Sequence, residues 1–251
     1  MTHGGARGVR RRPGLDVRCY LAEFIGTGIL VLVGPGAAMV AASTHAFGHA
    51  GVALAFGLVV TLLVAAFGTT SGAHVNPAVT LAFWSVRRFP GPAVLPYVAA
   101  QCAGAVAASL ALRWLLGPVG GLGATVPALD LGRAFAVEAG YSAILALVIL
   151  AVATDERVPR SVPPFVIGAT VFAGALVTGP LTGGSFNPAR SFGPAVAGGG
   201  WVAHWLYWAA PVLGMVAAMR GYEYLRDASP PAVVPLGVPV GAEGPLGADD
   251  P

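Results

Sequence analysis

Two short segments of this chain share a pattern that can hold polar groups inside an apolar environment. Residues 71–78 read SGAHVNPA and residues 182–189 read TGGSFNPA, one in each half of the 251-residue chain. Proline suits the first position of a helix, and Asn directly before it is a good N-cap. Asn76 and Asn187 are therefore predicted to begin two helices, each with roughly half a positive charge at that end. Such helix ends can bind a passing oxygen atom and repel a cation.

The composition places these segments in a membrane protein. Hydrophobic residues make up 56% of the chain and charged residues only 10%, whereas soluble domains carry roughly 25% charged residues. The 14 basic residues are all arginine and do not gather with aromatic residues on one stretch, so we expect no nucleic-acid partner. Cys19 and Cys102 lie in or beside apolar stretches and are interpreted as packing residues, without a disulfide or a metal site.

Six apolar stretches have about the 20 residues that a bilayer requires. They lie near residues 17–42, 50–70, 93–116, 132–153, 163–181 and 202–225. The first is too long for the apolar part of a signal peptide and contains Glu23. Two shorter stretches, 76–86 and 187–197, follow the Asn-Pro-Ala boxes and would cross only about half a bilayer. Residues 1–16, which are basic and rich in glycine, and the proline-rich residues 226–251 are expected to be disordered.

The two halves of the chain repeat the same order of elements. Residues 17–116 and 132–225 each contain three spans, one half-helix after the second span, and a glutamate, Glu23 or Glu138, near the start. Three spans is an odd number, so the halves must lie in opposite orientations in the membrane, as in transporters with inverted repeats. Most arginines fall on one side if both termini are cytoplasmic, which is the predicted orientation.

The half-helices imply a pore. Entering from opposite faces, their starts would meet near the middle of the membrane, and residues 71–75 and 182–186 would be non-helical there. Such backbone is tolerated at this depth only where it is buried in protein or lines a water-filled cavity. We therefore predict a passage lined by the loop carbonyls.

These motifs resemble the aquaporin, or major intrinsic protein, family over about residues 17–225. The resemblance depends on Asn76-Pro77-Ala78, Asn187-Pro188-Ala189, Arg190 directly after the second box, and the two glutamates. It implies an all-α integral membrane fold with six transmembrane helices and two half-helices. It also implies a passive channel, not an enzyme and without a cofactor, that conducts water and excludes protons and ions. A homotetramer in the plasma or inner cell membrane is implied as well.

The family's spacing places four residues at the selectivity filter: Phe56, Ala175, Gly184 and Arg190. Strict water channels typically carry His at the position of Ala175 and a bulkier residue at that of Gly184, so the implied filter is wide. That width favours glycerol, urea, ammonia, hydrogen peroxide or metalloid acids as additional solutes. Two features favour water. Ser191 occupies the position of the Asp that glycerol facilitators usually carry, and Tyr207-Trp208 resembles an aromatic pair of water channels. An aromatic belt at the membrane interface is the alternative interpretation of Tyr207-Trp208.

The remaining polar residues have alternative interpretations. Glu23 and Glu138 are interpreted as acceptors for the amides of the two loops, with a proton-coupling site in a secondary transporter as the rival hypothesis. Gln101 is expected to support them as a polar packing residue. The loop positions expected to line the pore are His74, Val75, Ser185 and Phe186. His45, His49 and His204 fall near the outer side, and the small residues Ala100, Gly104 and Ala108 suit either a contact between the repeats or a subunit interface.

Overall fold

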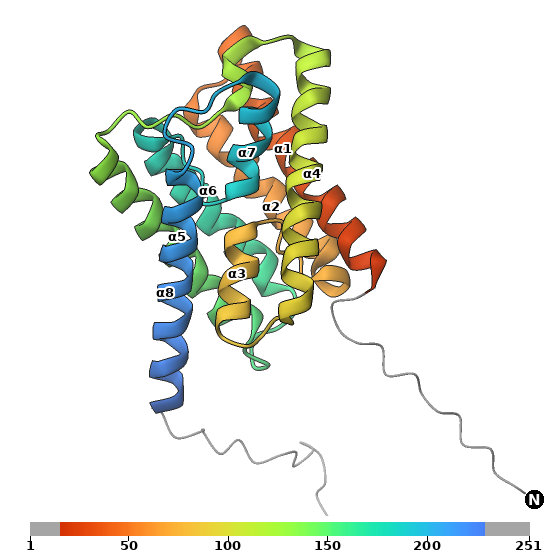
Figure 1. Cartoon of the computed structure of the whole chain (residues 1–251), viewed down its shortest axis with the longest axis vertical. Coiled ribbons are helices and arrows are strands. Elements are labelled where there is room, and N and C mark those ends of the chain that lie inside the picture. The colour runs from red at the N-terminus through yellow and green to blue at the C-terminus, as the bar shows by residue number, and fades with distance from the viewer. Residues whose placement is uncertain (1–15, 229–251) are drawn as a thin grey trace, which may run out of the picture.

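The computed structural model describes residues 16–228 (Figure 1), and within them the chain is helical, without strands. The long helices are α1 (Val17–Thr44), α2 (His49–Ser71), α4 (Gly91–Leu116), α5 (Leu131–Ala153), α6 (Val162–Thr182) and α8 (Leu206–Ala228). The short ones are α3 (Pro77–Ser85), α7 (Pro188–Gly198) and the 3-10 helix η1 (Val119–Gly123). This confirms the predicted fold class of long helices with two half-helices.

The predicted spans differ from the observed helices mainly in the C-terminal span. Residues 202–205 form turns, so α8 begins at Leu206 and continues past the predicted boundary at 225 to Ala228. Asp16 caps α1, and the rest of the predicted terminal segments 1–16 and 226–251 lies outside the described residues. Within the described residues 16–228, five helices are long and apolar enough to cross a membrane. The exception among the long helices is α8, because its C-terminal half carries Arg220, Glu223 and Arg226.

The halves are packed as two equivalent units. Helix α1 packs on α4 and α5 packs on α8, while α2 and α6 contact each other between the halves. Each short helix packs on the last long helix of the other half, α3 on α8 and α7 on α4. Figure 1 shows α7 above α3, one in each half of the bundle's length, and α1 begins toward the same end at which α8 finishes. The short helices therefore approach each other head to head near the centre.

Glycine permits the closest helix contacts at equivalent places in the two halves. A Cβ atom added at Gly104 of α4 would overlap the carbonyl oxygen of Phe24 in α1. A Cβ atom added at Gly214 of α8 would overlap the carbonyl oxygen of Ala139 in α5. Gly104 thus lies in a contact within the first half, neither between the halves nor at a subunit interface as the spacing of small residues suggested.

We predict that Gly104→Ala destabilises the bundle, because the methyl group meets backbone that cannot rotate away. Overpacking of this kind costs typically 1–3 kcal/mol, and the thermal unfolding midpoint of the detergent-solubilised protein should fall. Gly140→Ala in α5 is the matched control, since a Cβ there meets nothing within 4 Å. Equal midpoints for the two variants would show that α1 and α4 are not in such close contact.

Candidate functional site

The two Asn-Pro-Ala boxes begin α3 and α7. Asn76 is extended, and its Oδ1 accepts a hydrogen bond from the amide of Ala78 at 2.9 Å. Asn187 is extended as well, and its Oδ1 accepts from the amides of Ala189 and Arg190 at 3.0 and 3.2 Å. Proline at the first helical position has no amide hydrogen to satisfy. Each box therefore caps its helix with the asparagine oxygen and leaves the asparagine nitrogen for other partners.

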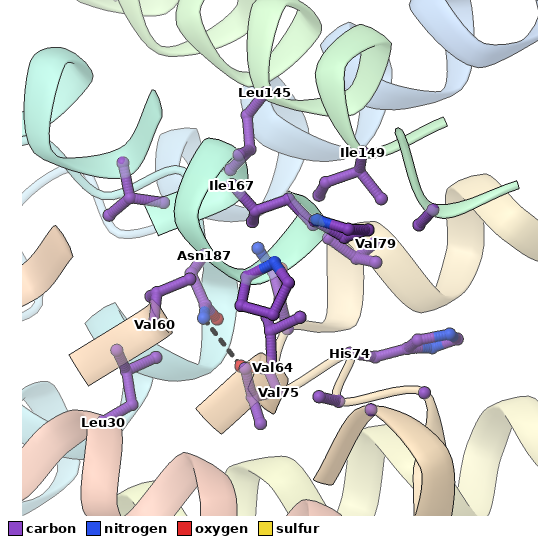
Figure 2. Close-up of a pocket in the computed structure, with 18 of the residues that line it drawn as sticks. Leu30, Val60, Val64, His74, Val75, Val79, Leu145, Ile149, Ile167 and Asn187 are labelled. Carbon is purple, nitrogen blue, oxygen red and sulfur yellow. Dashed lines mark hydrogen bonds between the residues drawn. The ribbon is translucent and has the colours of Figure 1, made fainter. Parts of the chain in front are cut away.

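The asparagine nitrogens connect the two boxes to each other. Asn76 Nδ2 donates to the carbonyl oxygen of Phe186 at 2.8 Å, and Asn187 Nδ2 donates to that of Val75, also at 2.8 Å. Figure 2 shows the second of these bonds. Because an amide nitrogen carries two hydrogens, each asparagine keeps one further donor. The pair of crossed bonds fixes the two helix starts face to face.

Glu23 holds the first loop from a fully buried position. Its carboxylate accepts hydrogen bonds from the amides of His74 and Val75 at 2.9 and 2.6 Å, and from the Ser71 hydroxyl at 2.7 Å. Gln101 Nε2 donates to the same carboxylate at 2.7 Å. All these partners belong to the loop or to packing side chains, which favours the loop-supporting role over a proton-coupling site.

Glu138 makes the equivalent contacts in the second half and is also fully buried. It accepts from the amides of Ser185 and Phe186 at 3.0 and 2.9 Å, and from the Thr182 hydroxyl at 2.6 Å. In both halves the carboxylate thus binds two successive amides just before the asparagine. The carboxylates thus bind the amides, while the carbonyls of Val75 and Phe186 accept the bonds from the opposite asparagines.

Both loops contain a residue other than glycine in the left-handed backbone conformation. Val75 and Phe186 have φ values of 42° and 51°, and positive φ is unfavourable for a β-branched or bulky residue. Such strain persists only where the surroundings fix the backbone. Here the carboxylates of Glu23 and Glu138 bind the amides of the strained residues themselves. The strain turns the carbonyls of Val75 and Phe186 towards the opposite asparagine.

Two cavities lie on either side of this centre. The first, which we call the Asn-Pro-Ala cavity, has a volume of about 390 Å³ and is lined by both asparagines and the predicted loop residues His74, Val75, Ser185 and Phe186. Figure 2 shows Asn187 and His74 among the apolar side chains around it, such as Val60 and Ile167. The second, the Arg190 cavity, has about 440 Å³ and is lined by Ala175, Gly184 and Arg190. Phe56 borders both cavities, so the four predicted filter residues gather where the two cavities adjoin.

Arg190 is held rigidly at this junction with only 4% of its surface exposed. Its Nη1 donates to the carbonyl oxygen of Gly123 at 2.7 Å, and its guanidinium carbon lies 4.9 Å from the centre of the Phe56 ring. Its Nε has no hydrogen-bond partner within the described part of the chain. A charged side chain inside the membrane is costly and marks a functional position.

A family model described as Major intrinsic protein matches residues 12–222. The chain belongs to this family. Among its relatives, the probable aquaporin AqpM of Archaeoglobus fulgidus is 40% identical over 237 residues, covering 82% of this chain and 96% of that protein. Aquaporin NIP6-1 of Arabidopsis thaliana is 40% identical over 206 residues, covering 82% and 68%. The structure of the aquaglyceroporin from Plasmodium falciparum superposes with a TM-score of 0.76 at 26% identity, over 85% of this chain and 99% of that one.

Membership of the major intrinsic proteins confirms the resemblance drawn from the motifs. Members of the family are membrane channels for water or small solutes and are not enzymes, and this chain is a multi-pass membrane protein. The similar proteins include both aquaporins and an aquaglyceroporin.

Sequence reasoning missed several partners that complete the site. Tyr97 and Tyr207 donate from their hydroxyls to the last carbonyls of α2 and α6, those of Ser71 and Thr182, at 3.0 and 2.6 Å. Tyr207 is fully buried, so an interfacial belt is wrong for this residue. The sequence signal that could have identified the two tyrosines is that they follow the two boxes at similar distances along the chain. Nothing in the sequence pointed to Gly123 as the acceptor for Arg190.

His74 has a packed environment. Its ring stacks on Phe83 at 5.1 Å between centroids and lies against Phe89 and Tyr97, and its Nδ1 is 3.1 Å from the Thr80 hydroxyl. Among residues 16–228 no three potential ligand side chains gather in a way that could hold a metal ion. The arrangement favours a structural imidazole at the cavity wall.

The loop between α5 and α6 forms the far end of the Asn-Pro-Ala cavity. Thr154 and Arg160 line the cavity there, and Arg157 is paired with Asp155 at 2.6 Å. Hydrogen bonds from the Arg157 side chain and amide hold the pKa of the Asp155 carboxyl well below its usual range. Asp155 is therefore ionised and occupied with Arg157, and Arg160 places a positive charge at the cavity.

We predict that Glu138→Gln lowers both stability and water permeability. Glutamine presents an amide group where the carboxylate now accepts three bonds, so at least one loop N–H loses its acceptor, at a cost of about 1–3 kcal/mol. Thermal unfolding in detergent and osmotic water permeability per reconstituted molecule would measure the two effects. Glu223→Gln is the control for the same substitution, because its bond to Arg88 lies at the surface. Equal behaviour of the two variants would contradict the loop-supporting role of Glu138.

Proposed function

We propose that this protein is a passive channel for water that also admits small neutral solutes and excludes protons and ions. The observation that carries the proposal is the junction of the two cavities at Phe56, next to Arg190. A solute moving between the cavities passes this junction and then the paired asparagines. Fixed donors and apolar walls are the features by which such pores select their solutes.

Charge exclusion follows from the positive groups along this route. The N-termini of α3 and α7 face each other through the crossed asparagine bonds, and each carries a partial positive charge. Arg190 lies on one side of them and Arg160 at the far end of the other cavity. A hydronium or metal cation would meet positive potential at all three levels, whereas water and neutral solutes would not.

The width of the filter supports solutes larger than water. Ala175 and Gly184 contribute no bulk and no side-chain donor to the Arg190 cavity, so the filter is formed mainly by Phe56 and Arg190. A glycerol or metalloid facilitator with water as a secondary solute is the second candidate function, and these two small residues favour it. Glycerol, urea, ammonia, hydrogen peroxide and metalloid acids are the neutral solutes that fit this description.

We further propose that the protein lies in the plasma or inner cell membrane with both termini in the cytoplasm. Arg88 binds Glu223 of α8, and Arg226 of α8 binds Thr154 after α5, so basic residues converge at the end of the bundle where α8 finishes. Basic residues concentrate on the cytoplasmic side. Assembly as a homotetramer is proposed because aquaporins are generally tetramers.

The direct test is flux through proteoliposomes. Osmotic shrinkage in an impermeant osmolyte, followed by reswelling in glycerol, urea or ammonia, measures water and solute permeability separately. We expect fast shrinkage and faster reswelling than in protein-free liposomes, with no dependence on an ion gradient. Saturating flux driven by an ion gradient would support a secondary transporter, and water flux without solute flux would show that the filter is narrow.

We predict that Arg190→Val combined with Phe56→Ala raises proton and ion leak, because the pair supplies the fixed positive charge and the bulk at the junction. The leak would be measured as dissipation of a pH gradient across the same proteoliposomes. Arg133→Val is the control, since Arg133 lies at the surface in a pair with Asp130. If the pH gradient dissipates no faster with the double variant than with the control, Arg190 does not exclude charge.

A further inference from the structure

The imidazole of His49 lies beside the filter residues and has no part in the contacts described above. His49 is the first residue of α2 and lines the Arg190 cavity together with Ala175 and Arg190. Its Nε2 lies 2.9 Å from the carbonyl oxygen of Leu176, the residue next to Ala175. A carbonyl can only accept, so Nε2 carries the hydrogen, and in the neutral ring Nδ1 is an acceptor. Because Nε2 is occupied by this bond, Nδ1 is the ring nitrogen left for another partner.

The surface of α6 is shaped to receive this ring. A Cβ atom added at Gly179 would overlap Cε1 of His49 and would lie only 3.0 Å from Nε2 and 3.2 Å from Nδ1. The imidazole therefore rests directly on the backbone of Gly179, one turn along α6 from Ala175. A larger residue at position 179 would displace the ring from the filter.

The filter side chains themselves contribute a donor and apolar surface but no acceptor. Arg190 can only donate, Phe56 is apolar, and Ala175 has no polar side-chain atom. A solute with O–H or N–H groups loses water partners on entering such a space, and an unpaired polar group costs free energy. Nδ1 of His49 supplies the acceptor that Arg190 lacks.

We propose that His49 forms a solute-binding station beside the filter, where Nδ1 accepts a hydrogen bond from a small neutral molecule before its oxygen reaches Arg190. The ligand class is uncharged molecules that carry donors and an acceptor together, such as amides and polyols. The inference rests on the proposed channel function and deepens it. His49, which packs on Gly179, would then help to determine solute selectivity at the place where Ala175 has only a small side chain.

Two substitutions of His49 separate the acceptor from the space that the ring fills. His49→Phe keeps a flat ring without an acceptor, and we expect urea and glycerol permeability to fall roughly three- to tenfold, the change that one hydrogen bond of ordinary strength produces. Water permeability should stay within about twofold, because a single water molecule finds its other partners at Arg190 and the loops. His49→Gln retains a donor and an acceptor and should recover most of the urea and glycerol flux.

A substitution at Gly179 displaces the imidazole of His49 without changing its chemistry. Gly179→Ala should lower urea and glycerol permeability as His49→Phe does, and should have no additional effect in the His49→Phe background. His45→Asn is the control, since His45 lines the same cavity and caps α1 with a φ of 55°, which asparagine tolerates. We expect it to leave the urea-to-water ratio unchanged.

The outcomes distinguish this inference from the channel function itself. If the wild-type protein conducts water and urea but His49→Phe and Gly179→Ala keep the wild-type urea-to-water ratio, the station is refuted and the channel stands. If His45→Asn changes the ratio as much as His49→Phe, the effect belongs to the cavity mouth and the station is likewise refuted. No flux of either solute through the wild-type protein would overturn both proposals.

Discussion

The structure depends on one pair of hydrogen bonds, from each asparagine of the Asn-Pro-Ala boxes to a carbonyl of the opposite loop. At 2.8 Å each, they join segments from the two halves of the chain at the point where two helices begin. Inside a membrane such helix ends and loops have no lipid partners for their polar groups. The crossed bonds satisfy part of this demand within the protein. They also bring two positive helix ends into opposition, which is the arrangement that a cation cannot easily pass.

The rest of the bundle secures these bonds twice, once in each half. A buried carboxylate binds two amides of each loop, and a tyrosine hydroxyl binds the last carbonyl of the preceding helix. Because α3 packs mainly on α8 and α7 mainly on α4, each short helix is positioned chiefly by the other half. The Asn-Pro-Ala cavity is therefore a property of the paired halves, because both asparagines line it together with apolar side chains.

Much of the fold could be predicted because its determinants are local. The apolar stretches, the caps before Pro77 and Pro188, and the odd number of spans in each half lead to the helices and their inverted order. The bounds of α8 were less predictable, since turns at 202–205 precede its start and its last turns are charged, which blurs the apolar pattern. Glu23 and Glu138 were interpretable because a buried carboxylate needs donors and the loop amides were the nearest unpaired ones.

The parts of the site that escaped prediction depend on contacts between distant segments. The bond from Arg190 to Gly123 involves a connecting segment without a motif. The seat of His49 on Gly179 joins the start of one helix to the end of another, and sequence periodicity carries no information about such an approach. The position of Phe56 at the junction came from family spacing alone, since an isolated phenylalanine in a span is usually a packing residue.

On the proposed route, solutes pass from one cavity to the other beside Ala175 and Phe56. Replacing Ala175 with tryptophan fills the Arg190 cavity at the filter without touching the crossed asparagine bonds. Val177→Trp is the matched substitution, because Val177 lies on the same helix with half its surface exposed. The measurement is the osmotic water permeability of proteoliposomes that contain equal amounts of each folded variant. We expect the water permeability of Ala175→Trp to fall to about the protein-free level while Val177→Trp conducts like the wild type. Undiminished water flux in Ala175→Trp would show that water does not take this route.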